Sequence, residues 1–325
     1  MTIILGVDGG GSKTHAVVVD AEGNRLGEGL AGCGNHQISG VDIAVANLRQ
    51  AVEGALRQAH LEPTDVDFVQ YGLAGADRDR DFQILRPALA ALPFRTWDVV
   101  CDTLAGLRNG SPDYVGVVLV CGSATNAMGR NRLQTVQTGG FGALFGDAAG
   151  GAYLSEQTFR SAVRSWDYRD VPSILPDAVA RHLGFPAMEP LLAYYLDHDI
   201  RTVPLSLTLV LHEAAEARDE LAIRILRDTG HELGLAANSV VRRLGGFEGE
   251  RFPVVLVGSI LQKGRSPYLL RTLQETVRRE NPDADFVLPQ MAPVYGAVLL
   301  GMDCLGVPVT EHITAKFASY GGHEG

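Results

Sequence analysis

Glycines near the start of the chain are the first residues whose spacing suggests chemistry. The stretch "GVDGGGSKT" places Gly9, Gly10 and Gly11 directly after Asp8 and shortly before Lys13. Successive backbone N–H groups without side chains can surround a phosphate, and an adjacent carboxylate is a ligand that Mg²⁺ prefers. We therefore expect a phosphate-binding loop at this position.

The residues around this loop decide which kind of loop it is. A P-loop needs G-x-x-x-x-G-K-[ST] leading into a helix, and a dinucleotide fingerprint needs G-x-G-x-x-G opening a helix. Here the apolar, strand-like runs "TIILGVD" and "HAVVVDAEGN" lie on either side. The pattern predicts the tip of a β-hairpin and matches neither of the two helix-linked motifs.

Asp102 is a second residue placed for chemistry. In "VVCDTLAGLRNG" it follows an apolar strand and precedes a helix. A carboxylate at a strand end can act as a general base, and it can equally cap the helix that follows. From the residues alone both interpretations stay open, and the helix cap is the more common one.

The elements that would position these residues form two similar series. The first half reads as three strands, a helix over about 42–60, and then strand, helix, strand and helix. The series restarts at "DYVGVVLVCGSATNAMGRN", again a hairpin with a small polar tip. A largely helical section follows over about 177–244, and then come strand, helix, strand and helix. A duplicated α/β fold is expected to place its two tips across a cleft, an arrangement suited to a triphosphate.

Composition limits the class of protein. The chain has 325 residues, is 46% hydrophobic and carries a net charge of −10. An acidic chain is a poor general ligand for nucleic acid. No apolar run approaches membrane-spanning length, and no signal peptide is evident. A cytoplasmic protein is therefore expected, with no nucleic-acid or membrane partner. Its cysteines show no zinc or redox spacing; they are Cys33, Cys101, Cys121 and Cys304.

Several motifs together resemble a known family. "GVDGGGSKT", "VCDTLAG", "GVVLVCGSATNAMGR", "GGFGALFGDAAGGAYL" and "VVLVGSI" resemble the BadF/BadG/BcrA/BcrD ATPase family of the actin/Hsp70/sugar-kinase superfamily, most closely its N-acetylglucosamine kinases. The resemblance implies an α/β fold of two duplicated ribonuclease H-like (actin-like ATPase) domains with a cleft between them. The first domain would be 1–107 plus about 306–325, and the second would be 108–305.

The resemblance also implies roles for individual residues, with ATP and Mg²⁺ as cofactors. Asp102 would be the catalytic base, and Asp8 would hold Mg²⁺ through water. The residues implied to bind nucleotide are Gly10, Gly11, Ser12, Lys13, Ser123, Gly258, Ser259 and Lys263. Those implied to bind the sugar are Asn35, His36, Thr125, Asn126, Gly140, Phe141 and Asp147.

Three positions depart from the family pattern. The second phosphate loop, usually GTGS, has Ala124 in place of its second glycine. The usual GGWG has Phe141, which keeps an apolar face and loses the indole donor. The usual GDEGS reads "GDAAG", so that Ala148 replaces a glutamate. The second loop and the sugar contacts are therefore expected to be altered.

The expected activity is ATP-dependent phosphorylation of an amino-sugar hydroxyl, at the 6-OH of N-acetylglucosamine or glucosamine. Two alternatives stay open: an ATPase that activates an iron–sulfur electron-transfer partner, and a nucleotide-binding regulatory protein without turnover. The family resemblance also implies a homodimer.

Overall fold

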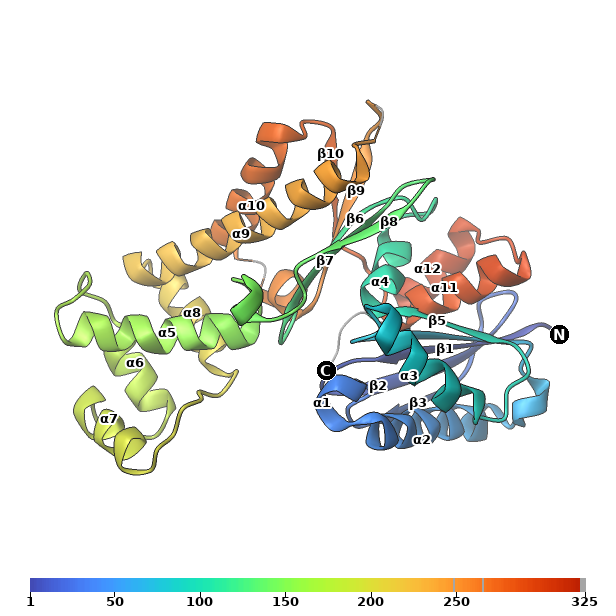
Figure 1. Cartoon of the computed structure of the whole chain (residues 1–325), viewed down its shortest axis with the longest axis horizontal. Helices are drawn as coiled ribbons and strands as arrows, with labels where there is room; N and C mark the ends of the chain where they lie inside the picture. The colour runs from blue at the N-terminus through green and yellow to red at the C-terminus, as the bar shows by residue number, and fades with distance from the viewer. Residues whose placement is uncertain (248, 265, 322–325) are drawn as a thin grey trace. The chain divides into compact units, whose positions relative to one another are not determined.

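Two five-stranded sheets organise the chain in a computed structural model that describes residues 1–247, 249–264 and 266–321 (Figure 1). The first sheet lies within one compact unit, and most of the second sheet lies within the other. The first unit comprises Met1–Val118, Gly129–Gln134 and Val287–Gly325, and the second comprises Leu119–Met128 and Thr135–Phe286.

The first sheet has the strand order β3-β2-β1-β4-β5. Strands β1, β2 and β3 are antiparallel neighbours, whereas β4 and β5 run parallel to β1. Gly9 pairs with Thr14, which leaves Gly10–Lys13 as the turn. The predicted hairpin tip is thus confirmed. The strands are β1 (Ile3–Gly9), β2 (Thr14–Asp20), β3 (Arg25–Ala31), β4 (Phe68–Leu73) and β5 (Trp97–Cys101).

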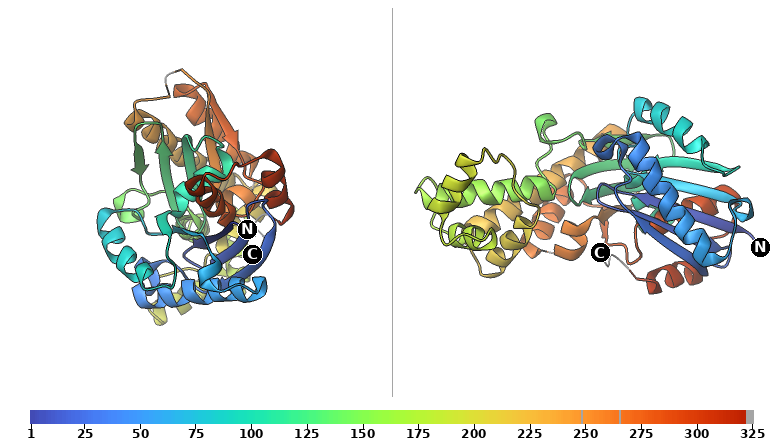
Figure 2. Two further views of the ribbon diagram at one scale, coloured as in Figure 1. Left: turned by 90° about the vertical axis from the view of Figure 1, so that its right-hand side faces the viewer. Right: turned by 90° about the horizontal axis from the view of Figure 1, so that it is seen from below.

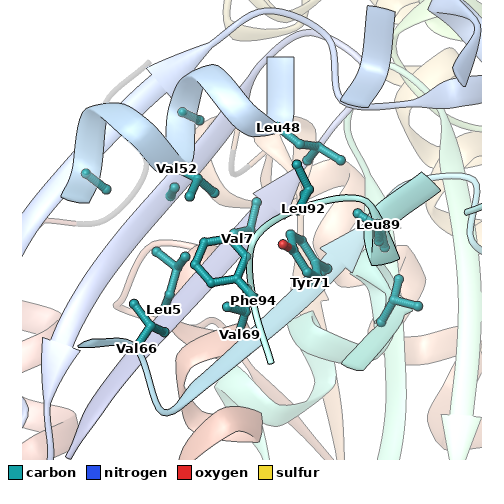
Figure 3. Close-up of a cluster of buried hydrophobic side chains, with 14 of the residues drawn as sticks. Leu5, Val7, Leu48, Val52, Val66, Val69, Tyr71, Leu89, Leu92 and Phe94 are labelled. Carbon is teal, nitrogen blue, oxygen red and sulfur yellow. The ribbon is translucent and has the colours of Figure 1, made fainter. Parts of the chain in front are cut away.

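Helices cover both faces of this sheet (Figures 1 and 2). On one face Leu5 and Tyr71 pack with Leu48 and Leu89 of α2 and α3 (Figure 3). On the other, Ile4 packs with residues of α11 and α12. Successive strand residues face opposite sides, so a strand buried on both faces is apolar almost throughout. The helices of this unit are α1 (His36–Ser39), α2 (Val41–Ala59), α3 (Asp79–Ala90), α4 (Asp102–Gly110), α11 (Val294–Leu305) and α12 (Glu311–Ser319), with the 3₁₀ turn Pro63–Asp65.

The second sheet repeats the first. Its strand order is β10-β9-β6-β7-β8. Read from β8, the third strand of the unit is followed by its second, first, fourth and fifth strands, as in the first sheet. This repetition confirms the predicted duplication. The strands are β6 (Gly116–Cys121), β7 (Thr125–Arg130), β8 (Thr135–Thr138), β9 (Phe252–Val257) and β10 (Ala284–Val287).

The predicted helical section is divided into several helices that pack on one another (Figure 2). Helix α9 also packs along α10 and against β8. The helices of this unit are α5 (Gly151–Trp166), α6 (Leu175–His182), α7 (Met188–Asp197), α8 (Leu207–Glu216), α9 (Glu220–Leu244) and α10 (Pro267–Glu280), with the 3₁₀ turn Ala143–Phe145 and the π-helical turn Ile260–Gly264.

Some elements differ from the expectation. Helix α11, which the sequence analysis placed with the second domain, packs on β1, β4 and α4 of the first unit. Strand β8 and helix α12 were not anticipated, and "SILQKG" forms a π-helical turn. Across the described residues, no helix combines the length and apolar character that crossing a membrane requires.

Candidate functional site

The first hairpin tip is held by backbone hydrogen bonds on each side. The Gly10 N–H donates to the Lys13 carbonyl at 2.9 Å, and the Gly34 N–H donates to the Gly10 carbonyl at 3.0 Å. Within the part of the chain that the structure describes, the N–H groups of Gly11 and Ser12 donate to no protein acceptor. Fixed backbone donors of this kind can bind an anion, as expected of a phosphate loop.

Three aspartates lie at the carboxyl ends of the parallel strands of the first sheet. We call them the acidic edge: Asp8, Asp77 and Asp102. The register aligns Gly9 with Leu73 and Leu73 with Cys101, so the carboxyl ends of β1, β4 and β5 coincide. Asp8 is the penultimate residue of β1, Asp77 lies in the loop after β4, and Asp102 comes directly after β5. The sequence analysis had not singled out Asp77, which no motif marks.

Asp102 is fixed by its neighbours. It is the first residue of α4, and its Oδ1 accepts the Thr103 N–H at 2.7 Å. The Cys101 thiol lies 3.1 Å from Asp77 Oδ1 and 3.3 Å from Asp102 Oδ1, and so bridges the two carboxylates. Cys101, and not Asp102, occupies the N-cap position of α4. Asp102 is the first residue of the helix, and its carboxylate contacts a backbone N–H of the first turn.

Burial dominates the electrostatics of the acidic edge. It raises the pKa of Asp8 to about 7, with a further rise from the negative charge of Asp102 and an opposing effect of Lys13. Burial also raises the pKa of Asp102; the Cys101 thiol opposes this rise and Asp77 adds to it. A buried carboxylate with a raised pKa gains from a nearby cation or from taking up a proton.

The loop predicted to bind sugar packs against the β4–α3 loop. Asn35 caps α1, and its Oδ1 accepts the Gln37 N–H at 2.8 Å. His36 is only 8% exposed, and its Nε2 lies 3.4 Å from Asp81 Oδ1. Arg78 donates to Asp81 through Nε at 2.8 Å, and this hydrogen bond holds the pKa of Asp81 well below its usual range. The structure therefore gives His36 a buried contact that orders the loop, while Asn35 is half-buried.

The second hairpin tip is tied to the start of α5. The Gly151 N–H donates to the Gly122 carbonyl at 2.7 Å, and the Ala152 N–H donates to the Ser123 carbonyl at 3.0 Å. Ala124 is exposed, and its backbone lies outside the left-handed region that favours glycine. Its Cβ therefore fits the loop without strain. Ser123 is also exposed at the tip.

The predicted adenosine motif lies against this second tip. Gly258 has a φ of +96°, and a Cβ added there would come within 2.5 Å of the Cys121 carbonyl carbon. The Gly258 N–H donates to Gln262 Oε1 at 3.0 Å. Ser259 follows, and Lys263 belongs to the π-helical turn. Only a residue without a side chain permits this close approach.

Residues predicted to bind sugar meet at a cavity of about 250 Å³ in the second unit, which we call the glycine pocket. Thr125, Asn126, Gly140 and Asp147 all line it, whereas Phe141 is outside the lining and 48% exposed. The sequence analysis missed the opposite wall, since nothing marked α9 as functional. That wall is formed by Glu232, Leu233, Leu235, Ala236 and Ser239.

Asp147 holds the loop that forms the pocket. Its Oδ1 accepts the Gly140 N–H at 3.1 Å, and its Oδ2 accepts the Gly142 N–H at 2.6 Å. Both glycines have positive φ values. A carboxylate that accepts two backbone N–H groups stabilises such a turn, so Asp147 shapes the glycine pocket in addition to any contact with a ligand.

The acidic edge suits a cation that is shared with a substrate. Among the described residues, no group of three or more His, Cys, Asp or Glu has the geometry to hold a metal ion by itself. Mg²⁺ commonly uses one or two carboxylates together with waters and substrate phosphates. Asp8, half-buried beside the glycine turn and with a raised pKa, fits that mode of binding.

Solved structures define the class of this fold. The chain superimposes on a candidate N-acetylglucosamine kinase from Chromobacterium violaceum with a TM-score of 0.71 and 23% identity, covering 92% of this chain and 99% of that one. A ROK family glucokinase from Streptomyces griseus, solved with glucose and AMPPNP, matches with a TM-score of 0.59 and 17% identity over 93% and 99% of the chains. The fold is thus that of two-domain, actin-like ATPase sugar kinases.

The sequence itself shows the family of this chain. Residues 5–301 match the BadF/BadG/BcrA/BcrD ATPase family, and the chain belongs to that family. A relative from Dictyostelium discoideum named N-acetyl-D-glucosamine kinase is 26% identical over 93% of this chain and 98% of its own length. Membership of an ATPase family implies ATP binding, and this distant homologue is a sugar kinase.

Proposed function

We propose that the protein transfers the γ-phosphoryl group of ATP to a hydroxyl of an amino sugar, at the 6-OH of N-acetylglucosamine or glucosamine. The observation that carries this proposal is the acidic edge beside a glycine turn in which the N–H groups of Gly11 and Ser12 donate to no acceptor among the described residues. Phosphoryl transfer needs positioning and charge neutralisation, and these residues supply both.

Each residue has a role in the proposed reaction. The N–H groups of Gly11 and Ser12 and the Lys13 side chain would bind the phosphates, which would lie close to the Gly10 backbone, and Asp8 would hold Mg²⁺ through water. The metal would neutralise charge on the phosphates when it is bound. In the second unit the nucleotide would contact Ser123, Gly258, Ser259 and Lys263.

Asp102 would act as the general base. It would accept the proton of the sugar hydroxyl as the hydroxyl oxygen forms a bond to the γ-phosphorus. The bond between that phosphorus and the β,γ-bridging oxygen breaks, and ADP leaves. The raised pKa of Asp102 supports this role, because a carboxylate that binds protons more tightly is a stronger base.

Sugar recognition would draw on residues of each unit. In the first unit Asn35 would contact the sugar directly, and His36 would order the loop through Asp81. In the second unit the proposed contacts are Thr125, Asn126, Gly140, Phe141 and Asp147. Four of these five residues, all except Phe141, line the glycine pocket, and this supports their assignment to sugar binding.

The test is ADP release from Mg-ATP with and without a panel of sugars: N-acetylglucosamine, glucosamine, N-acetylmannosamine and glucose. We expect sugar-stimulated release that falls by about 10²- to 10⁴-fold in Asp102→Asn, the range typical of general-base catalysis. Asp98→Asn is the matched control, because this residue of the same strand forms an exposed ion pair with Arg86. Release that ignores every sugar would instead indicate the ATPase alternative, and ATP binding without release would indicate the regulatory one.

A further inference from the structure

Two carboxylate residues line the glycine pocket: Asp147, on the glycine-rich loop, and Glu232, on α9. The proposed function uses Asp147 and gives no role to Glu232. Asp147 already accepts hydrogen bonds from two backbone N–H groups of its own loop. Its negative charge is therefore largely compensated within the protein.

Glu232 differs from Asp147 in this respect. Its side chain is half-buried, and it forms no hydrogen bond or ion pair with any of the described residues. Burial raises the pKa of Tyr153 on the neighbouring helix α5, and the negative charges of Glu232 and Asp228 add to this rise. A carboxylate at the wall of a cavity, without a protein partner, gains from a cationic ligand group.

The remaining lining indicates how large and how polar this ligand is. The small apolar side chains of Ala148, on the loop, and Ala236, on α9, also line the pocket, and the hydroxyls of Thr138 and Ser239 lie 3.3 Å apart. At about 250 Å³ the pocket is smaller than the roughly 300–1,000 Å³ of pockets for drug-sized ligands. It suits a small ligand that carries hydroxyls and one positive charge.

We propose that Glu232 is a specificity-determining residue that selects a hexosamine with a free, protonated amine over its N-acetylated form. This inference rests on the proposed amino-sugar kinase function and names its preferred substrate class. The ammonium group would donate to the Glu232 carboxylate, whereas a neutral acetamido group offers one weaker N–H donor and needs more room. Charge-assisted hydrogen bonds are about twice as strong as neutral ones.

The test compares kcat/KM for glucosamine and for N-acetylglucosamine at about pH 7 in the wild type and in Glu232→Gln. We expect the ratio of glucosamine to N-acetylglucosamine to fall about tenfold in the variant, through KM for glucosamine and with little change in kcat. Asp228→Asn is the matched control: it removes the same charge one turn earlier on α9, at an exposed position outside the pocket. An unchanged ratio in Glu232→Gln, or an equal fall in Asp228→Asn, would overturn the inference.

Equilibrium binding separates this inference from the proposed function. Calorimetric titration of glucosamine into the wild type and into Glu232→Gln needs no turnover, so it decides the role of Glu232 even if no sugar is phosphorylated. Binding that weakens about tenfold in the variant supports the role. The absence of glucosamine binding to the wild type, or equal affinity of both proteins, contradicts it. Unchanged thermal unfolding of the variant shows that any loss is local.

Discussion

Gly258 and Gly122 offer a direct comparison between a glycine that the packing requires and one that only a ligand would require. Both lie in the predicted nucleotide loops of the second unit. A Cβ added to Gly258 would meet the carbonyl carbon and oxygen of Cys121 at 2.5 Å and the Gly122 nitrogen at 2.8 Å. A Cβ added to Gly122 would meet no atom within 4 Å, and its φ is not in the positive region. Gly258→Ala should therefore distort the protein itself, whereas Gly122→Ala should not.

The expected cost of Gly258→Ala follows from two effects. A residue with a side chain at a φ of +96° is strained by about 1–3 kcal/mol. Relieving contact with backbone atoms, which cannot rotate away, costs about 1–3 kcal/mol more. The reduced freedom of the unfolded chain offsets up to about 1 kcal/mol. We expect a net destabilisation of about 3 kcal/mol.

Urea unfolding followed by circular dichroism measures this loss. With a slope of about 1–3 kcal/mol per molar urea, the midpoint of Gly258→Ala should fall by about 1 M or more. Gly122→Ala should unfold within about 0.5 kcal/mol of the wild type, but should bind ATP more weakly if phosphate approaches the Gly122 backbone. Equal stability of Gly258→Ala and wild type would refute the geometric reasoning. So would a large loss of stability in Gly122→Ala.

Three further positions, Asp81, Cys101 and Asp147, test the rest of the site. Asp81→Asn should destabilise the protein by about 2 kcal/mol above pH 4, because it weakens the hydrogen bonds that Arg78 makes to the carboxylate. The pKa of Asp81 is lower in the folded protein than its unfolded value of 3.8, so its ionised form stabilises the fold fully above pH 3.8. This stabilisation is lost as the pH falls towards the folded pKa. In urea titrations, the difference in stability between wild type and variant should therefore shrink below about pH 4. Cys101→Ala should lower kcat more than Cys101→Ser, because only serine can still bridge the acidic edge; equal kcat values in steady-state assays would exclude this positioning role. Asp147→Ala should raise KM for the sugar by roughly tenfold with a smaller effect on kcat, because two loop N–H groups lose their acceptor; an unchanged KM would show that the loop keeps its shape without it.

Local signals in the sequence determined the strands, the hairpin tips and most of the helices. The apolar run of β1 and the glycines after Asp8 predicted a buried strand and a tight turn, and both are present. These signals are reliable because strand burial and turn conformation depend on adjacent residues. Short elements such as β8 and α12 were not predicted, because their adjacent residues carry no strong pattern.

Only the tertiary structure decided which distant segments come together. An apolar helix face such as that of α11 shows that the helix packs, but not on which sheet, and here it covers the first. The same holds for the site. Asp77 reaches Asp102 through the Cys101 thiol, and Glu232 reaches the glycine pocket from α9, far along the chain from the loop opposite. Contacts between residues so distant in sequence depend on how whole elements pack, and no local pattern encodes them.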